Sequence, residues 1–110
     1  MSTESVEIIS DEQTRLLDEL QSLLEKQIEV IHKGDFRTSE ALAEQSNSLV
    51  AELVRTKTFE KTEFDEHREC LAKLYRELIL KAAVEKDRLG KQLQQISQGR
   101  KTLKAYRGRG

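Results

Sequence analysis

Residues 16–53 read LLDELQSLLEKQIEVIHKGDFRTSEALAEQSNSLVAEL, and this stretch decides the fold. Apolar side chains recur at spacings of three and four on both sides of HKGDF (32–36), a pattern typical of two amphipathic helices. Gly34 can adopt the left-handed conformation that ends a helix, and Asp35 can cap the next helix by accepting its free amide hydrogens. The sequence therefore predicts an antiparallel helical hairpin with a tight turn at 32–36.

Both helices of the hairpin have a boundary signal in the sequence. Ser10 is followed three residues later by Gln13, which matches the capping-box pattern, so the first helix is expected at about residues 11–33. The second helix is expected at about residues 36–56, because the threonines that follow weaken helix propensity. At 1.5 Å per residue each helix would be roughly 33–36 Å long.

A third helix is expected at about residues 62–105, where the apolar spacing persists. At roughly 66 Å it would be much longer than its partners, so it either bends near Gly90 or extends beyond the hairpin. In both cases the apolar stripe on its last half has no obvious partner within the chain, and such a stripe usually marks an interaction surface. The stripe consists of Leu89, Leu93, Ile96 and Leu103.

These segments predict an all-α fold. The expected architecture is the antiparallel hairpin plus the long third helix, in an elongated, coiled-coil-like three-helix bundle. Residues 1–106 form a single helical domain in this interpretation, and residues 107–110 (RGRG) are a disordered basic end. The absence of proline and the abundance of Leu, Glu, Lys, Gln and Ala favour long helices over a turn-rich sheet.

Charge is distributed unevenly along the chain. Up to Asp87 there are 12 basic and 20 acidic residues, whereas the residues after it include seven Lys or Arg and no acid. This basic end allows an alternative function, nucleic-acid binding through the tail. Against it stand the acidic body, the single tail aromatic Tyr106, and basic residues that interleave with the apolar stripe, so no nucleic-acid partner is expected.

Several functional classes lack their residues in this sequence. No secretory signal and no apolar run near the ~18 residues of a membrane span occur, and the single Cys70 fits a reducing compartment. A cytoplasmic protein without membrane insertion is therefore expected. His67 and Cys70 share a helical face, but only His32 remains as a further typical nitrogen or sulfur ligand, too few for a zinc site. Neither a phosphate-binding loop nor a catalytic constellation is present, so we expect no enzyme, no cofactor and no metal.

The hairpin of residues 16–53 and the segment LYRELILKAAVEKDRLGKQLQQISQGRKTLKAYRG (74–108) together resemble flagellar export chaperones of the FlgN type. The first segment is similar to the family's N-terminal hairpin, and the second to its long final helix, with its terminal Leu-x-x-Tyr at Leu103 to Tyr106. The resemblance implies a cytosolic chaperone of flagellar type III export without ATP hydrolysis or a cofactor. Its partners would be the C-terminal helical segments of hook–filament junction proteins, and then the export gate and its ATPase.

The resemblance also implies where the partner binds. Family substrate contacts fall on the C-terminal helix, which by position gives Leu89, Leu93, Ile96, Leu103 and Tyr106. Helix-in-groove recognition uses apolar anchors at this spacing, and the flanking Lys and Arg favour a carboxylate-bearing partner. The alternatives are that the stripe completes a longer intramolecular bundle or a homodimer, and that the protein is a generic coiled-coil adaptor or a filament-cap chaperone.

Overall fold

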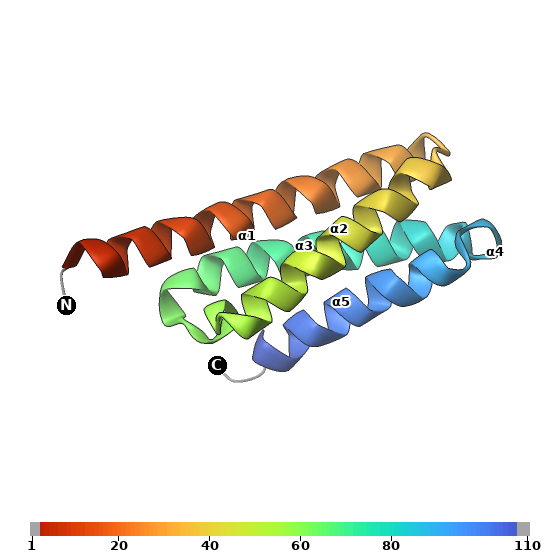
Figure 1. Ribbon diagram of the computed structural model, residues 1–110. Helices are drawn as coiled ribbons and strands as arrows, with labels where there is room; N and C mark the ends of the chain where they lie inside the picture. The colour runs from red at the N-terminus through yellow and green to blue at the C-terminus, as the bar shows by residue number, and fades with distance from the viewer. Residues whose placement is uncertain (1–2, 108–110) are drawn as a thin grey trace.

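The computed structural model describes the backbone of residues 3–107 and the side chains of residues 11–106. The all-α prediction is confirmed, and Figure 1 shows the helices side by side in a bundle. In chain order the elements are α1 (Thr3–His32), α2 (Phe36–Arg55), the 3-10 turns η1 (Thr58–Glu60) and η2 (Thr62–Phe64), α3 (Asp65–Val84), the short α4 (Lys86–Leu89) and α5 (Lys91–Arg107).

The helices form two antiparallel hairpins, α1–α2 and α3–α5, that pack against each other (Figure 1). The helix α1 contacts α2 and α3, and α5 contacts the same two helices from the other side. Because the chain crosses between the hairpins through η1 and η2, α1 runs parallel to α3, and α2 runs parallel to α5. The cross-section is therefore a square in which α1 and α5 occupy opposite corners.

The turn expected at residues 32–36 is present. Gly34 has a φ of +81°, the left-handed conformation that glycine adopts at helix ends. The Gly34 amide donates to the Ile31 carbonyl at 3.0 Å, and the Asp35 amide donates to the Val30 carbonyl at 2.8 Å. The Asp35 carboxylate then caps α2 by accepting from the Thr38 amide at 3.2 Å and from the Thr38 hydroxyl at 2.6 Å.

The cap predicts a specific acid sensitivity. The hydrogen bonds from the Thr38 hydroxyl and amide lower the pKa of Asp35 below its ordinary value of 3.8. A lowered pKa stabilises the folded state above the ordinary pKa, and this contribution disappears as the pH falls through the folded-state value. We expect Asp35→Ala to lower the melting temperature by a few degrees at neutral pH, and by less at pH 3. An equal loss at both pH values in thermal denaturation would contradict the cap's role.

The third helix differs from the expectation of one long helix over residues 62–105. The segment at 62–64 is the turn η2, α3 ends at Val84, and α5 folds back along α3 after a reversal at Gly90. Gly90 has φ +49° and ψ −115°, a backbone conformation that L side chains rarely adopt. The bend was predicted near this residue, but the elongated three-helix arrangement was not what the fold adopts. A fourth long helix completes the bundle instead.

The first helix also begins earlier than the expected residue 11, because α1 starts at Thr3. The capping-box interpretation of Gln13 is not what this side chain does. Gln13 is buried, its Nε2 donates to the Thr56 carbonyl at 3.3 Å, and its Oε1 accepts from Lys61. The predicted disorder of residues 107–110 falls on a segment of which only the backbone of Arg107 is described.

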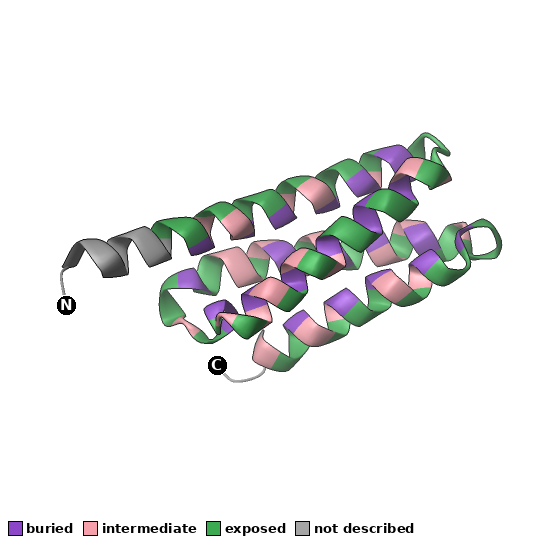
Figure 2. Cartoon of the chain, viewed as in Figure 1, coloured by how far each residue is buried: buried purple, intermediate pink, exposed green. Residues whose placement is uncertain are grey.

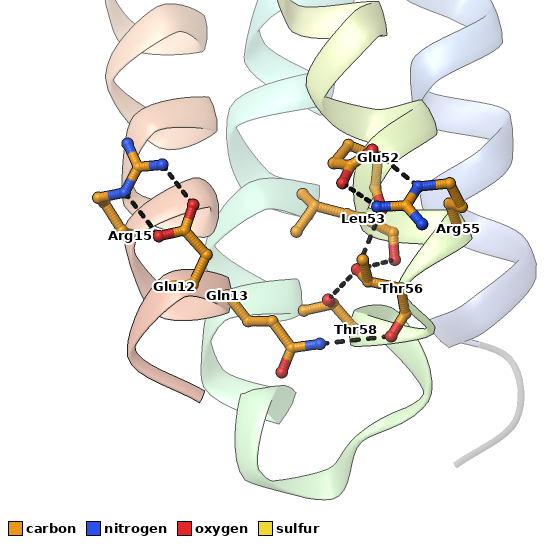
Figure 3. A network of polar contacts seen from close by, with 8 residues as sticks. All are labelled: Glu12, Gln13, Arg15, Glu52, Leu53, Arg55, Thr56 and Thr58. Carbon is orange, nitrogen blue, oxygen red and sulfur yellow. Dashed lines mark hydrogen bonds and ion pairs between the residues drawn. The ribbon is translucent and has the colours of Figure 1, made fainter. Parts of the chain in front are cut away.

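A small polar network connects the start of the described part of α1 to the crossing between the hairpins (Figure 3). Besides the bond from Gln13, the Thr56 hydroxyl donates to the Glu52 carbonyl at 3.0 Å and lies 2.7 Å from the Thr58 hydroxyl. These bonds satisfy the last carbonyl groups of α2 in the absence of a glycine cap. The diagonal crossing is thereby held to both α1 and α2.

The core runs the length of the bundle, and Figure 2 shows its buried residues on the inward side of every long helix. Most of it is aliphatic, with Phe59, Phe64 and Tyr75 as its aromatic members. One polar pair crosses between α1 and α2, where the Gln27 Nε2 donates to the Ser39 hydroxyl at 3.2 Å. The other core members are Leu17, Leu20, Leu24, Ile31, Val50, Leu53, Leu71, Leu78, Ala82, Leu89, Ile96 and Leu103.

Candidate functional site

The structure covers the apolar stripe that was expected to lack a partner within the chain, so that expectation is wrong. Leu89, Ile96 and Leu103 are 4%, 2% and 2% exposed, and they pack into the core between α2 and α3. Leu93 and Tyr106 are half-buried at its edge, and the Tyr106 ring lies 5.8 Å from that of Phe59. The five candidate residues are thus brought together along one seam, the inner side of α4 and α5.

The seam of α5 contains buried polar atoms that no described hydrogen bond satisfies. Gln92 donates its Nε2 to the Phe36 carbonyl at 2.8 Å, but its Oε1 has no partner among the described residues. The Gln95 Oε1 also has no partner among the described residues, although the Gln95 backbone carbonyl accepts from the Asn47 side-chain amide at 3.2 Å. Such atoms are rare in well-packed cores, because they lose their bonds to water without replacement.

Tyr75 and Gly99 form the tightest contact between α3 and α5. Tyr75 is 1% exposed, and its hydroxyl has no described hydrogen-bond partner. A methyl group at Gly99 would come within 2.6 Å of that hydroxyl oxygen, so only glycine fits here without a shift. Burial raises the pKa of the Tyr75 phenol, which therefore stays protonated. Sequence reasoning did not single out Gly99, although a glycine within a helical apolar period was the available signal.

Opposing contributions act on the docking of α5. Its own range fully buries two large aliphatic side chains, Ile96 and Leu103, each stabilising by about 1.5–3 kcal/mol. Three unsatisfied atoms lie on it or against it, those of Gln92, Gln95 and Tyr75, and each costs about 1–3 kcal/mol. In the described part of α1, by contrast, three leucines are fully buried and one side-chain atom lacks a partner. The seam of α5 thus combines apolar burial with unsatisfied polar atoms.

Three surface grooves are lined by α5, and two of them lie between α5 and a neighbouring helix. The groove toward α2 encloses about 370 Å³ and has a mainly apolar lining that includes Val50, Val54 and Gly99. The groove toward α3 encloses about 140 Å³, and its lining consists of Ala72, Arg76, Arg100, Leu103 and Lys104. The first groove can take apolar side chains, and the second presents three cations beside two apolar residues.

His67 and Cys70 could also carry chemistry, but neither belongs to a cluster of reactive groups in the described part of the chain. The His67 Nε2 lies 3.5 Å from the Asp18 carboxylate, and its ring meets Phe64 edge-on. Cys70 is a half-buried free thiol. Within the described residues, no three His, Cys, Asp or Glu side chains gather where a metal ion could be held. None of the described helices is both long and apolar enough to cross a membrane.

In comparisons with known proteins, no family model, no curated protein and no solved structure matches this chain.

Proposed function

We propose that this protein is a cytosolic chaperone of flagellar type III export. In this proposal it holds a C-terminal helical segment of a hook–filament junction protein in the place that α5 occupies on α2 and α3. The observation that carries the proposal is the seam of α5, which combines buried apolar side chains with unsatisfied polar atoms. The resemblance of residues 16–53 and 74–108 to FlgN-type chaperones supplies the pathway.

A partner helix could fill this seam better than α5 does. At Gln92, Gln95 and Gly99 the inner side of α5 offers two amides and a glycine, whereas an amphipathic helix with regular apolar anchors would place aliphatic groups there. The replacement removes the buried amide oxygens and adds apolar burial. The differential affinity that an exchange of helices requires is therefore available.

The chain also has a suitable pivot for the exchange. The connection from α3 to α5 contains one turn of helix, α4, between Glu85 and Gly90. Gly90 tolerates large changes of backbone angle, so α5 can swing away while α1, α2 and α3 keep their mutual contacts. In this proposal the candidate residues Leu89, Leu93, Ile96, Leu103 and Tyr106 hold the site closed and compete with the partner.

A chaperone of this kind needs no chemical step. It covers the apolar face of the export substrate's helix, which prevents early association, and it releases that helix at the export gate and its ATPase. Because a helix fills the seam in both the closed and the loaded form, the free-energy difference between these forms is smaller than the cost of an empty seam. Transfer to the next protein then requires only a modest further gain in affinity.

The proposal predicts that a bound partner displaces α5. We expect synthetic peptides with the C-terminal helical sequences of hook–filament junction proteins to bind the purified chain with a dissociation constant of about 1–100 μM. Hydrogen exchange should then show faster exchange across residues 91–107 and unchanged protection in α1. Fluorescence anisotropy of labelled peptide measures the affinity.

The matched control is the same peptide with its apolar anchors replaced by serine, which should not bind. Two results would overturn the proposal. One is an absence of binding by every junction-protein peptide at about 1 mM, where even a weak complex would form. The other is binding that leaves the protection of residues 91–107 at its free value, because a partner that replaces α5 must release it.

A further inference from the structure

The outward side of α3 carries an exposed apolar cluster. The helix α3 packs on α1 and α5, so the side opposite its buried residues faces away from the bundle. Leu80 and Val84 lie on that side one turn apart, and they are 65% and 81% exposed. They are the large apolar side chains that stay mostly exposed among the described residues, and Ala83 beside them is exposed as well. Such a cluster on one helix face is a candidate interaction surface.

Opposite charges flank this cluster at equal distances. Lys73 lies two helical turns before Leu80, and Asp87 lies two turns after it; both are exposed. Neither forms an ion pair with another described residue. Asp87 belongs to the short α4, but Ala82 and Leu89 are both buried seven residues apart, so the helical period continues through the join of α3 and α4. The two charges and Leu80 therefore share one outward line.

The order of these charges is self-complementary when two copies of α3 lie antiparallel. With Leu80 on the two-fold axis, Lys73 of one copy faces Asp87 of the other copy at both ends of the contact. A parallel pair would instead place each charge opposite its own kind, which is unfavourable. Between the two ends, the apolar cluster of each copy covers the aliphatic stems of Arg76 and Glu77 of the other copy.

We infer that this protein forms a two-fold symmetric dimer through the outward side of α3. The inference does not rest on the proposed function, because the contact includes no side chain of α5, the helix that the proposed export substrate displaces. Two single helices cover less area than the roughly 800 Å² per partner of a standard interface. The expected dimer is therefore weak, with a dissociation constant of about 10–500 μM.

The charge balance of this side favours a second copy over other occupants. The whole chain has a formal net charge of −1, so two copies hardly repel each other at long range. Within two turns of Leu80 the outward side carries two cations and two anions, namely Lys73, Arg76, Glu77 and Asp87. A balanced face of this kind offers no net attraction to an anionic membrane or to the phosphates of a nucleic acid.

Sedimentation equilibrium from about 10 μM to about 1 mM tests the association. We expect the mean mass to rise from that of one chain, 12.7 kDa, toward twice that value. Leu80→Glu should raise the dissociation constant at least about tenfold, because it brings two carboxylates together at the axis. The matched control is Ala41→Glu on the exposed side of α2, which should change it by less than about twofold. A wild-type chain that stays monomeric at about 1 mM would overturn the inference, and so would a dimer that survives Leu80→Glu.

Exchange of the flanking charges tests the proposed pairing. Lys73→Asp and Asp87→Lys should each weaken their own homodimer about tenfold, because like charges then meet at both ends. An equimolar mixture of the two variants should dimerise as tightly as the wild type, since each end of the heterodimer again holds opposite charges. The control pair is Lys26→Asp and Glu25→Lys on the exposed side of α1. If the control variants weaken their homodimers equally, net charge sets the association and the inference fails.

Cysteine cross-linking tests the orientation in a Cys70→Ser chain, which lacks the natural free thiol. Leu80→Cys places two thiols at the axis, where oxidation by air should link most of the dimer. Val84→Cys should link far less, because its two copies lie roughly 12 Å apart along antiparallel helices, beyond the reach of a disulfide. Equal linking at both positions would indicate parallel helices and would contradict the inference. Because both positions are exposed, circular dichroism should show the wild-type helix content in each variant.

Discussion

Replacement of Ile96 by aspartate is expected to detach α5 from the bundle. Ile96 is 2% exposed in the middle of the seam, so the substitution removes its apolar burial and places a carboxylate among apolar groups. Together these changes should cost about 3–5 kcal/mol of α5 docking. Because docking is the step that competes with the partner, the same substitution should raise the apparent affinity for a junction-protein peptide about tenfold or more.

Hydrogen exchange and peptide titration measure the two effects separately. Residues 91–107 should lose their protection in the Ile96→Asp chain, while α1 and α2 retain most of theirs. Ser97→Asp is the matched control, since Ser97 is exposed on the same helix and the added charge is identical. Weaker peptide binding by Ile96→Asp, with α1 and α2 still folded, would show that the stripe contacts the partner directly and would contradict the exchange of helices.

Tyr75 and Gly99 should be strongly coupled in stability. Tyr75→Phe removes an unsatisfied buried hydroxyl and is expected to stabilise the fold by about 1–2 kcal/mol. Gly99→Ala improves helix propensity by about 1 kcal/mol, but its methyl group would meet the Tyr75 hydroxyl at 2.6 Å. Overpacking of this kind costs about 1–3 kcal/mol, so the single Gly99→Ala change should be destabilising.

In the Tyr75→Phe background the closest atoms to the new methyl group become ring carbons at 3.1 Å. A shift of a few tenths of an ångström then removes the strain, so Gly99→Ala should become neutral or stabilising. Chemical denaturation of the four chains gives a coupling energy, expected at about 1–2 kcal/mol. Additive effects would show that the hydroxyl does not limit the approach of α5 to α3.

The hairpin of α1 and α2 could be predicted from sequence because its signals are local. A left-handed glycine and an aspartate cap lie next to each other at Gly34 and Asp35, between two clear apolar periods. At Gly90 the chain also reverses at a glycine with positive φ, but no cap residue follows it and the apolar period continues through it. Whether residues 62–105 form one long helix or fold back then depends on the burial of Ile96 and Leu103 against other helices. Local helix propensity contains no information about that burial.

The residues of the candidate site could be predicted from the sequence, but their burial could not. Periodicity found the stripe from Leu89 to Leu103, because that signal lies in spacing alone. Its cover comes from α2 and α3, and the contact depends on Gly99 leaving room for Tyr75. Likewise, Arg76 of α3 and Arg100 of α5 line one groove, a proximity that their sequence separation conceals.

The short connection through α4 has a consequence for how readily partners can be exchanged. It tethers α5 beside its own binding surface, so a detached α5 experiences an effective concentration in the millimolar range. Any partner helix therefore competes with α5, which stays tethered beside the binding surface and does not diffuse away. Binding of a partner helix then requires a high local concentration of that helix. Its release is completed within the same molecule, because α5 returns to the seam. The exposed seam is therefore available to unrelated apolar segments only briefly.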